Sequence, residues 1–131
     1  MRYDAPMREI SPEEMKGYVE GFRTRLALDS ARRRELAARA RKAADRCAVR
    51  LRAIPDVRRV FLYGSLAKGT FREGSDIDLA VEGLPTELHF RIWAELEEGE
   101  AFRIDLERWE ELSEGFRELV ESYGQLLHAR P

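Results

Sequence analysis

The sequence predicts an α+β domain, in which a small β-sheet is flanked by helices and preceded by an N-terminal helical extension. Residues 12–54 carry apolar side chains at helical spacing. After Pro55 the period changes, and short β-branched or aromatic runs alternate with helical segments. The 131 residues are enough for one core of ordinary size. We therefore expect residues 1–55 to form the helical extension and residues 56–131 to form the core domain.

The extension begins with a helix-capping sequence. Ser11 is a good N-cap, Pro12 suits the first helical position, and Glu14 completes a capping box, which predicts a helix over about 12–28. Asp29 and Ser30 either cap a second helix or lie within one long helix. An Ala-rich stripe follows and favours close packing against another helix, of the same chain or of a second copy. Its members are Leu36, Ala40, Ala43, Cys47, Leu51 and Ile54.

The core domain is predicted from alternating strand and helix patterns. In chain order we expect a strand at 57–63, a strand at 75–81, a helix at 86–98, a strand at 101–106 and a helix at 113–128. Gly64 ends the first strand. His89 and Trp93 lie in the first helix of this core and are predicted to be helix-packing or surface residues and not base-stacking groups. Cys47 is predicted to be a small core residue and no nucleophile.

Composition limits the class of protein. The single cysteine excludes an internal disulfide and fits a reducing cytoplasm. Residues 1–30 hold charges throughout and lack the apolar region of a signal peptide. No apolar run approaches the roughly 18 residues of a membrane span. We therefore expect a soluble, cytoplasmic protein.

Charge is segregated along the chain, although the net charge is only −2. Residues 23–59 contain 13 Lys/Arg against 4 Asp/Glu, a balance of +9, whereas residues 73–121 contain 4 against 16, a balance of −12. The two segments either neutralise each other in the fold or mark contact surfaces. For the basic segment 23–59, the candidate partners are RNA, an acidic protein, or a second copy in a homodimer formed by the N-terminal helices.

Carboxylates gather in the predicted strands. Asp76 and Asp78 are two positions apart, so their side chains share one sheet face at roughly 6.6 Å backbone separation. Asp105 has the same in/out alternation on a later strand. Carboxylates this close repel unless a cation lies between them. With no Cys/His cluster in the sequence, the expected metal prefers oxygen ligands, and Mg²⁺ is the natural candidate.

A phosphate-binding turn is predicted just before these acids. Gly64 lets an anion approach the backbone, because it has no Cβ. Ser65 adds a hydroxyl and an amide at the start of a short helix, where phosphate binds readily. Lys68 lies about one turn further on, and Arg72 follows in the loop. These four residues are the candidate ligands of a nucleotide's phosphates.

The stretch LYGSLAKGTFREGSDIDLAV at 62–81 joins Gly-Ser to Asp-x-Asp across ten residues. It resembles the signature of the DNA polymerase beta-like nucleotidyltransferase superfamily, and most of all the minimal nucleotidyltransferases (MNT). The resemblance covers about 57–128 and implies a small mixed sheet. It also implies a site in which Asp76 and Asp78 hold two Mg²⁺ ions, and in which Asp105 is the third, metal-binding carboxylate and accepts the proton of the nucleophile.

By the same resemblance, Gly64 and Ser65 hold the β- and γ-phosphates of ATP or another NTP. Similar minimal nucleotidyltransferases are the antitoxins of toxin–antitoxin systems, which transfer AMP to a tyrosine of a helical HEPN-type RNase toxin. The resemblance therefore implies an ATP-binding, magnesium-dependent protein adenylyltransferase with a HEPN partner. Two alternatives stay open: a transferase acting on a small hydroxylated molecule, and a non-catalytic module that masks its partner.

Overall fold

The computed structural model of the chain describes residues 9–131. Its first element is one continuous helix, α1 (Pro12–Arg52), so the long-helix alternative is the correct one. The predicted cap is confirmed, since the Ser11 Oγ accepts a hydrogen bond from the Glu14 amide at 3.1 Å. The chain forms two compact units, of which one ends at Arg32 and the other comprises Arg33–Pro131. The domain boundary predicted between residues 55 and 56 stays a prediction.

The second unit contains a mixed four-stranded sheet in the order β3-β2-β1-β4. Strand β1 (Arg59–Tyr63) pairs antiparallel with β2 (Ile77–Glu82) and with β4 (Gln125–Ala129), while β2 pairs parallel with β3 (Ile104–Arg108). The parallel pair is joined by a crossover through η1 (Thr86–Leu88) and α3 (His89–Glu98). The predicted α+β class with a small mixed sheet is confirmed.

The C-terminal segment corrects the sequence prediction. The helix expected over 113–128 ends earlier, as α4 (Glu114–Tyr123), and a strand, β4, follows it. The Gly124 amide donates the last helical hydrogen bond to the Val120 carbonyl at 2.8 Å. Beyond this point the backbone pairs with the open edge of β1, for example His128 with Val60. Pairing along an otherwise free strand edge therefore outweighs the helical pattern of the last residues.

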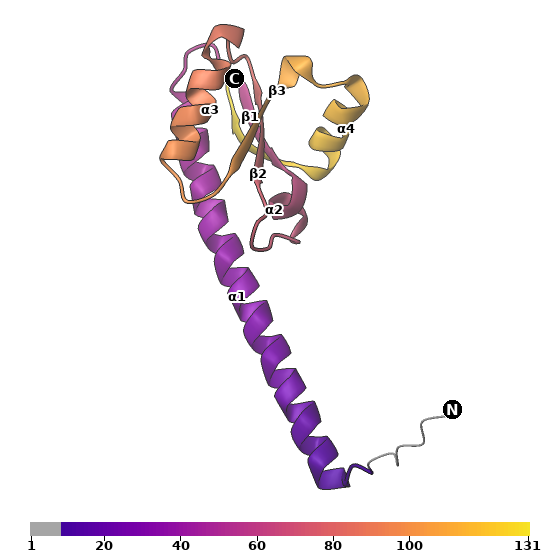
Figure 1. Cartoon of the computed structure of the whole chain (residues 1–131). Coiled ribbons are helices and arrows are strands. Elements are labelled where there is room, and N and C mark those ends of the chain that lie inside the picture. The colour runs from indigo at the N-terminus through magenta and orange to yellow at the C-terminus, as the bar shows by residue number, and fades with distance from the viewer. Residues whose placement is uncertain (1–8) are drawn as a thin grey trace, which may run out of the picture. The chain divides into compact units, whose positions relative to one another are not determined.

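Helices cover the two faces of the sheet (Figure 1). On one face, the C-terminal part of α1 and helix α3 pack on the strands; on the other face lies α4, with η2 (Trp109–Glu111) at its side. Ala40, Ala43, Cys47 and Leu51 of the Ala-rich stripe are buried in one core cluster with strand residues such as Leu62 and Leu79 and with Leu96 of α3. The stripe therefore shares its core with a helix of the same chain and with the sheet, which the sequence pattern did not predict as a partner.

Several side chains have the packing roles predicted for them. Cys47 is 1% exposed, and burial raises the pKa of its thiol to about 11, which makes it a poor nucleophile. His89 Nε2 donates to the Leu106 carbonyl at 2.7 Å, and Trp93 Nε1 donates to the Ile104 carbonyl at 2.6 Å. These two bonds occupy carbonyls of β3, an edge strand of the sheet.

The segregated charges partly neutralise each other. Arg46 pairs with Glu100 through two bonds of 2.7 Å, Arg50 pairs with Glu95 at 3.3 Å, and Arg59 pairs with Glu82. Within residues 9–131, no ion pair is recorded for the arginines between positions 23 and 39. None of the helices within residues 9–131 has the length and apolarity needed to span a membrane.

Candidate active site at the ends of β1 and β2

Strand register brings the predicted carboxylates to one end of the sheet. Tyr63, the last residue of β1, pairs with Asp78 of β2, and Asp78 pairs in turn with Asp105 of β3. Because paired residues point to the same face of a sheet, the Asp78 and Asp105 side chains are neighbours. Asp76 lies just before β2 and forms an ion pair with Arg103 at 3.5 Å. Asp78 and Asp105 thus lie side by side, with Asp76 at the entry to β2.

The turn after β1 packs directly against Asp78. Gly64 begins the short helix α2 (Gly64–Lys68) with φ of 73°, in the left-handed region that glycine tolerates. A Cβ at this position would overlap the Asp78 Oδ2 and would lie 2.9 Å from its Cγ. Glycine is therefore required here both for the backbone conformation and for the approach of the carboxylate. This contact joins the two halves of the sequence signature.

The carboxylates are half-buried and perturb one another. Burial, together with the charges of Asp105, Asp76 and Glu107, raises the pKa of Asp78 to about 6, against the opposing charge of Lys68. Burial and a hydrogen bond with Asp105 also raise the pKa of Glu107. A carboxyl cluster of this kind has too little positive charge around it, and a cation would relieve the repulsion.

Two groups of this cluster were missed by sequence reasoning. Glu107 and Arg103 each lie two positions from Asp105, and strict alternation along β3 was the signal that would have found them. Tyr63 is a third neighbour, since burial and then the charges of Asp105 and Asp78 raise the pKa of its hydroxyl. Its ring contacts Phe116 of α4 edge-on, with centroids 5.5 Å apart.

The predicted phosphate ligands lie in different settings. Ser65 follows Gly64 in α2, and Lys68 is exposed at the end of that helix. Arg72 lies in the following loop, where its amide donates to the Ser75 Oγ at 3.1 Å and its side chain is exposed. The structure thus holds Lys68 within the electrostatic reach of Asp78, while it records no contact between the Arg72 side chain and the carboxylates.

Metal binding stays a prediction. Within residues 9–131, no three His, Cys, Asp or Glu side chains already stand in the geometry of a metal cluster. The donors at this end of the sheet are all carboxylate oxygens, which are the ligands of Mg²⁺ and similar hard cations. Their chemistry and their mutual repulsion therefore fit such a cation.

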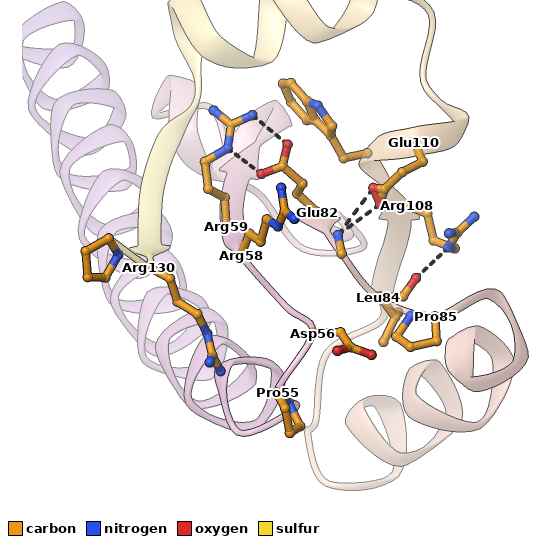
Figure 2. Close-up of a pocket in the computed structure, with 13 residues that line it drawn as sticks. Pro55, Asp56, Arg58, Arg59, Glu82, Leu84, Pro85, Arg108, Glu110 and Arg130 are labelled. Atoms are coloured by element: carbon orange, nitrogen blue, oxygen red, sulfur yellow. Dashed lines mark hydrogen bonds and ion pairs between the residues drawn. The ribbon is translucent and has the colours of Figure 1, made fainter.

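Two cavities lie at opposite ends of β1. The first, of about 270 Å³, lies beside the carboxylate end and is lined by Tyr63, Gly64, Lys68, Phe116, Leu119, Val120, Tyr123 and Gly124. The second, of about 1060 Å³, lies at the other end (Figure 2). Three of its four arginines are engaged within the protein: Arg59 holds Glu82 through bonds of 2.9 and 3.1 Å, Arg108 donates to the Leu84 carbonyl at 2.9 Å, and Arg130 donates to the Arg52 carbonyl at 2.8 Å. We therefore place the candidate site at the smaller cavity, beside the carboxylates of Asp78 and Asp105.

The mixed sheet with flanking helices has the α+β fold of the nucleotidyltransferases. Residues 47–131 match the family described as "Polymerase beta, Nucleotidyltransferase", and the chain belongs to this family. It is a nucleotidyltransferase by that membership. No curated protein matches the chain at a significant level.

Solved structures of toxin–antitoxin complexes are similar in fold. One, described as a toxin–antitoxin with AMP-PNP, has a TM-score of 0.58 and 24% identity, covering 66% of this chain and 73% of the other. Another, a tri-AMPylated HEPN toxin of Shewanella oneidensis in complex with an MNT antitoxin, has a TM-score of 0.55 and 21% identity, with coverages of 70% and 73%. A mutant MntA toxin–antitoxin complex has a TM-score of 0.53 and 27% identity, with coverages of 61% and 67%.

Proposed function

We propose that the chain is an antitoxin that transfers AMP from ATP to a tyrosine hydroxyl of a HEPN-type partner. The observation that carries the proposal is the contact between the Gly64 turn and Asp78, with Asp105 adjacent on β3. In this arrangement the backbone proposed to bind phosphate lies beside a carboxylate cluster. The family match and the similarity to complexes described with AMP-PNP and with an AMPylated HEPN toxin support it.

Asp76, Asp78 and Asp105 would hold two Mg²⁺ ions. When bound, these ions would neutralise charge on the triphosphate and favour ionisation of the acceptor hydroxyl. The Gly64 and Ser65 amides and the Ser65 hydroxyl would bind the β- and γ-phosphates, since the glycine leaves the backbone accessible there. Lys68 and Arg72 are proposed as further phosphate ligands.

The transfer follows from these positions. The acceptor oxygen forms a bond to the α-phosphorus, and the bond from that phosphorus to the bridging oxygen breaks, so that pyrophosphate leaves. Asp105 takes the proton of the acceptor hydroxyl. The protein contributes chiefly by positioning the reactants and by electrostatic stabilisation.

The test is label transfer from [α-³²P]ATP in the presence of Mg²⁺ and the protein encoded by the neighbouring gene, as the candidate partner. We expect label on that protein, and we expect Asp76→Ala to lower kcat by at least about 10³-fold, because a metal site contributes several kcal/mol to transition-state stabilisation. A decrease of tenfold or less would contradict the role of Asp76.

The two alternatives give different results in the same experiment. If an Asp76→Ala/Asp78→Ala variant neutralises the partner at unchanged potency, then the chain acts by masking. If pyrophosphate is released only when a small hydroxylated molecule is added, then the acceptor is that molecule. Matched gel-filtration profiles of wild type and variant exclude loss of folding as the cause.

We also propose that the N-terminal half of α1 pairs with a second copy. Met15, Val19, Phe22 and Leu26 recur at coiled-coil spacing and are 49, 39, 56 and 47% exposed. Glu13, Glu14 and Glu20 outnumber Lys16 up to Phe22, and arginines predominate from Arg23 onward, so an antiparallel pair would align opposite charges. Sedimentation of the full chain and of Val19→Glu/Phe22→Glu tests this, and an unchanged mass would refute it. RNA binding by 23–59 would instead appear as salt-dependent affinity for an RNA probe.

A further inference from the structure

The smaller cavity has a composition that the transfer reaction itself does not require. Its walls are aromatic or aliphatic, from Tyr63 of β1 to Phe116 and Tyr123 of α4, and Lys68 is the only charged residue among them. At about 270 Å³ it is just below the roughly 300–1,000 Å³ typical of pockets for drug-sized ligands. A cavity of this size and polarity fits one flat ring system.

The apolar side chains that α4 contributes to the walls are exposed to solvent. Phe116, Leu119 and Tyr123 of α4 are 37, 55 and 70% exposed, although they follow one another at helical spacing on one face. The rings of Tyr63 and Phe116 meet at 87°, so two aromatic walls stand nearly at right angles. A planar ligand can stack on one such ring and contact the edge of the other.

Residues shared between the cavity and the proposed phosphate site indicate whether the cavity binds the base of the nucleotide or the ring of the acceptor tyrosine. Gly64 and Lys68 line the cavity and also belong to the phosphate-binding set, whereas none of Asp76, Asp78 and Asp105 lines it. The ring of a tyrosine acceptor would have to place its hydroxyl at Asp105. The base of a nucleotide is instead connected to the phosphates through its ribose, which matches a cavity that opens beside Gly64.

We propose that this cavity between α4 and the Gly64 turn binds the purine base of ATP by stacking on its aromatic walls. The proposal rests on the proposed function, because it uses the Gly64 turn as the phosphate site. Stacking engages the π-face that every base has, and the walls offer few hydrogen-bonding groups. The cavity therefore favours purines over pyrimidines by ring area and discriminates little between ATP and GTP.

The test measures binding of Mg–ATP and of Mg–tripolyphosphate to the full-length chain by calorimetry. We expect Tyr123→Ala and Leu119→Ala each to weaken binding of ATP by about tenfold, because both remove apolar contacts with the base. Binding of tripolyphosphate should change less than twofold in both, because it has no base. Phe90→Ala is the matched control, because Phe90 is an aromatic side chain that is 79% exposed on α3 and outside the cavity.

Unchanged ATP affinity in both cavity variants would overturn the inference and leave the proposed function intact. A variant that binds ATP normally but shows a raised KM for the partner protein would also overturn it, and would assign the cavity to the acceptor. Failure of the wild-type chain to transfer AMP while its ATP binding still depends on Tyr123 would refute the proposed function alone. Tyr123 is 70% exposed, so its replacement leaves the fold unperturbed, which circular dichroism verifies.

Discussion

Replacing Gly64 by alanine tests the contact on which the candidate site depends. The substitution places a side chain in a backbone conformation with φ of 73°, which costs about 1–2 kcal/mol for an L-residue. The new Cβ would lie 2.9 Å from the Asp78 Cγ, whereas ordinary carbon contacts are about 3.5–4.0 Å. The Asp78 carboxylate must therefore move by roughly 0.6–1.1 Å. A displacement of about 1 Å in a catalytic group lowers the rate by about 10²-fold.

Gly69→Ala is the matched control for this experiment. Gly69 has φ of 82°, so alanine meets the same backbone strain there, but nothing lies within 4 Å of its added Cβ. Both variants should lose about 1–2 kcal/mol of unfolding free energy, or about 3–6 °C in Tm for a chain of this size. Only Gly64→Ala should lose AMP transfer, by about 10²-fold.

The assays are urea unfolding followed by circular dichroism and initial rates of label transfer to the partner. If Gly64→Ala keeps more than about a tenth of the wild-type rate, then the contact with Asp78 does not position a catalytic group. If Gly69→Ala is inactivated to the same extent, then the loss reports strain in the turn and not displacement of the carboxylate.

Three further results are expected. Arg59→Ala should lower the unfolding free energy by about 1–3 kcal/mol in urea titrations, because it removes a two-bond pair with Glu82 and contacts with two aromatic rings; a change below about 0.5 kcal/mol would contradict this. Arg46 holds the pKa of Glu100 below its usual range, so the native state gains stability above the unfolded pKa and loses it as pH falls. Glu100→Gln should thus be less stable than wild type at pH 7 and equally stable near pH 3, in thermal melts. At pH 8 the Cys47 thiol, with a pKa of about 11, should react with a thiol reagent only on unfolding, and a rapid reaction of the native protein would refute its burial.

The parts of the fold that sequence predicted are those encoded by local patterns. The capping sequence at Ser11 and the in/out alternation around Asp78 each depend on neighbours within a few residues. The end of the chain was predicted wrongly because β4 exists only by pairing with β1, more than 60 positions earlier in the chain, and helical spacing in residues 113–128 contains no trace of that contact. Long-range pairing of this kind depends on which strand edge is available in the folded chain, and residues close in sequence do not encode that.

The same distinction applies to the candidate site. The signature predicted that Gly64 and Asp78 belong together, and the structure shows the contact between them as the reason for glycine. Glu107 and the walls of the small cavity were not predicted. Glu107 lies outside the Gly-Ser and Asp-x-Asp signature, and the cavity forms only because α4 folds back over the end of β1 near Tyr63. A cavity lined by residues from elements far apart in the chain produces no regular spacing in the sequence, so it could not be predicted from one.

The opposite faces of β2 explain how the chain tolerates its carboxylate cluster. Ile77, Leu79 and Val81 point to one face and are fully buried, so they hold the strand in register between β1 and β3. Asp78 alternates with them and is carried onto the other face beside Asp105, where burial and then repulsion between the carboxylates raise its pKa. Because a shift of one residue would exchange the two faces, the apolar residues fix the position of the acids more firmly than their repulsion can displace them. The repulsion between the carboxylates is thus confined to the end of the sheet, where a cation and a triphosphate would relieve it. The buried apolar face of β2 provides the stability that offsets this repulsion.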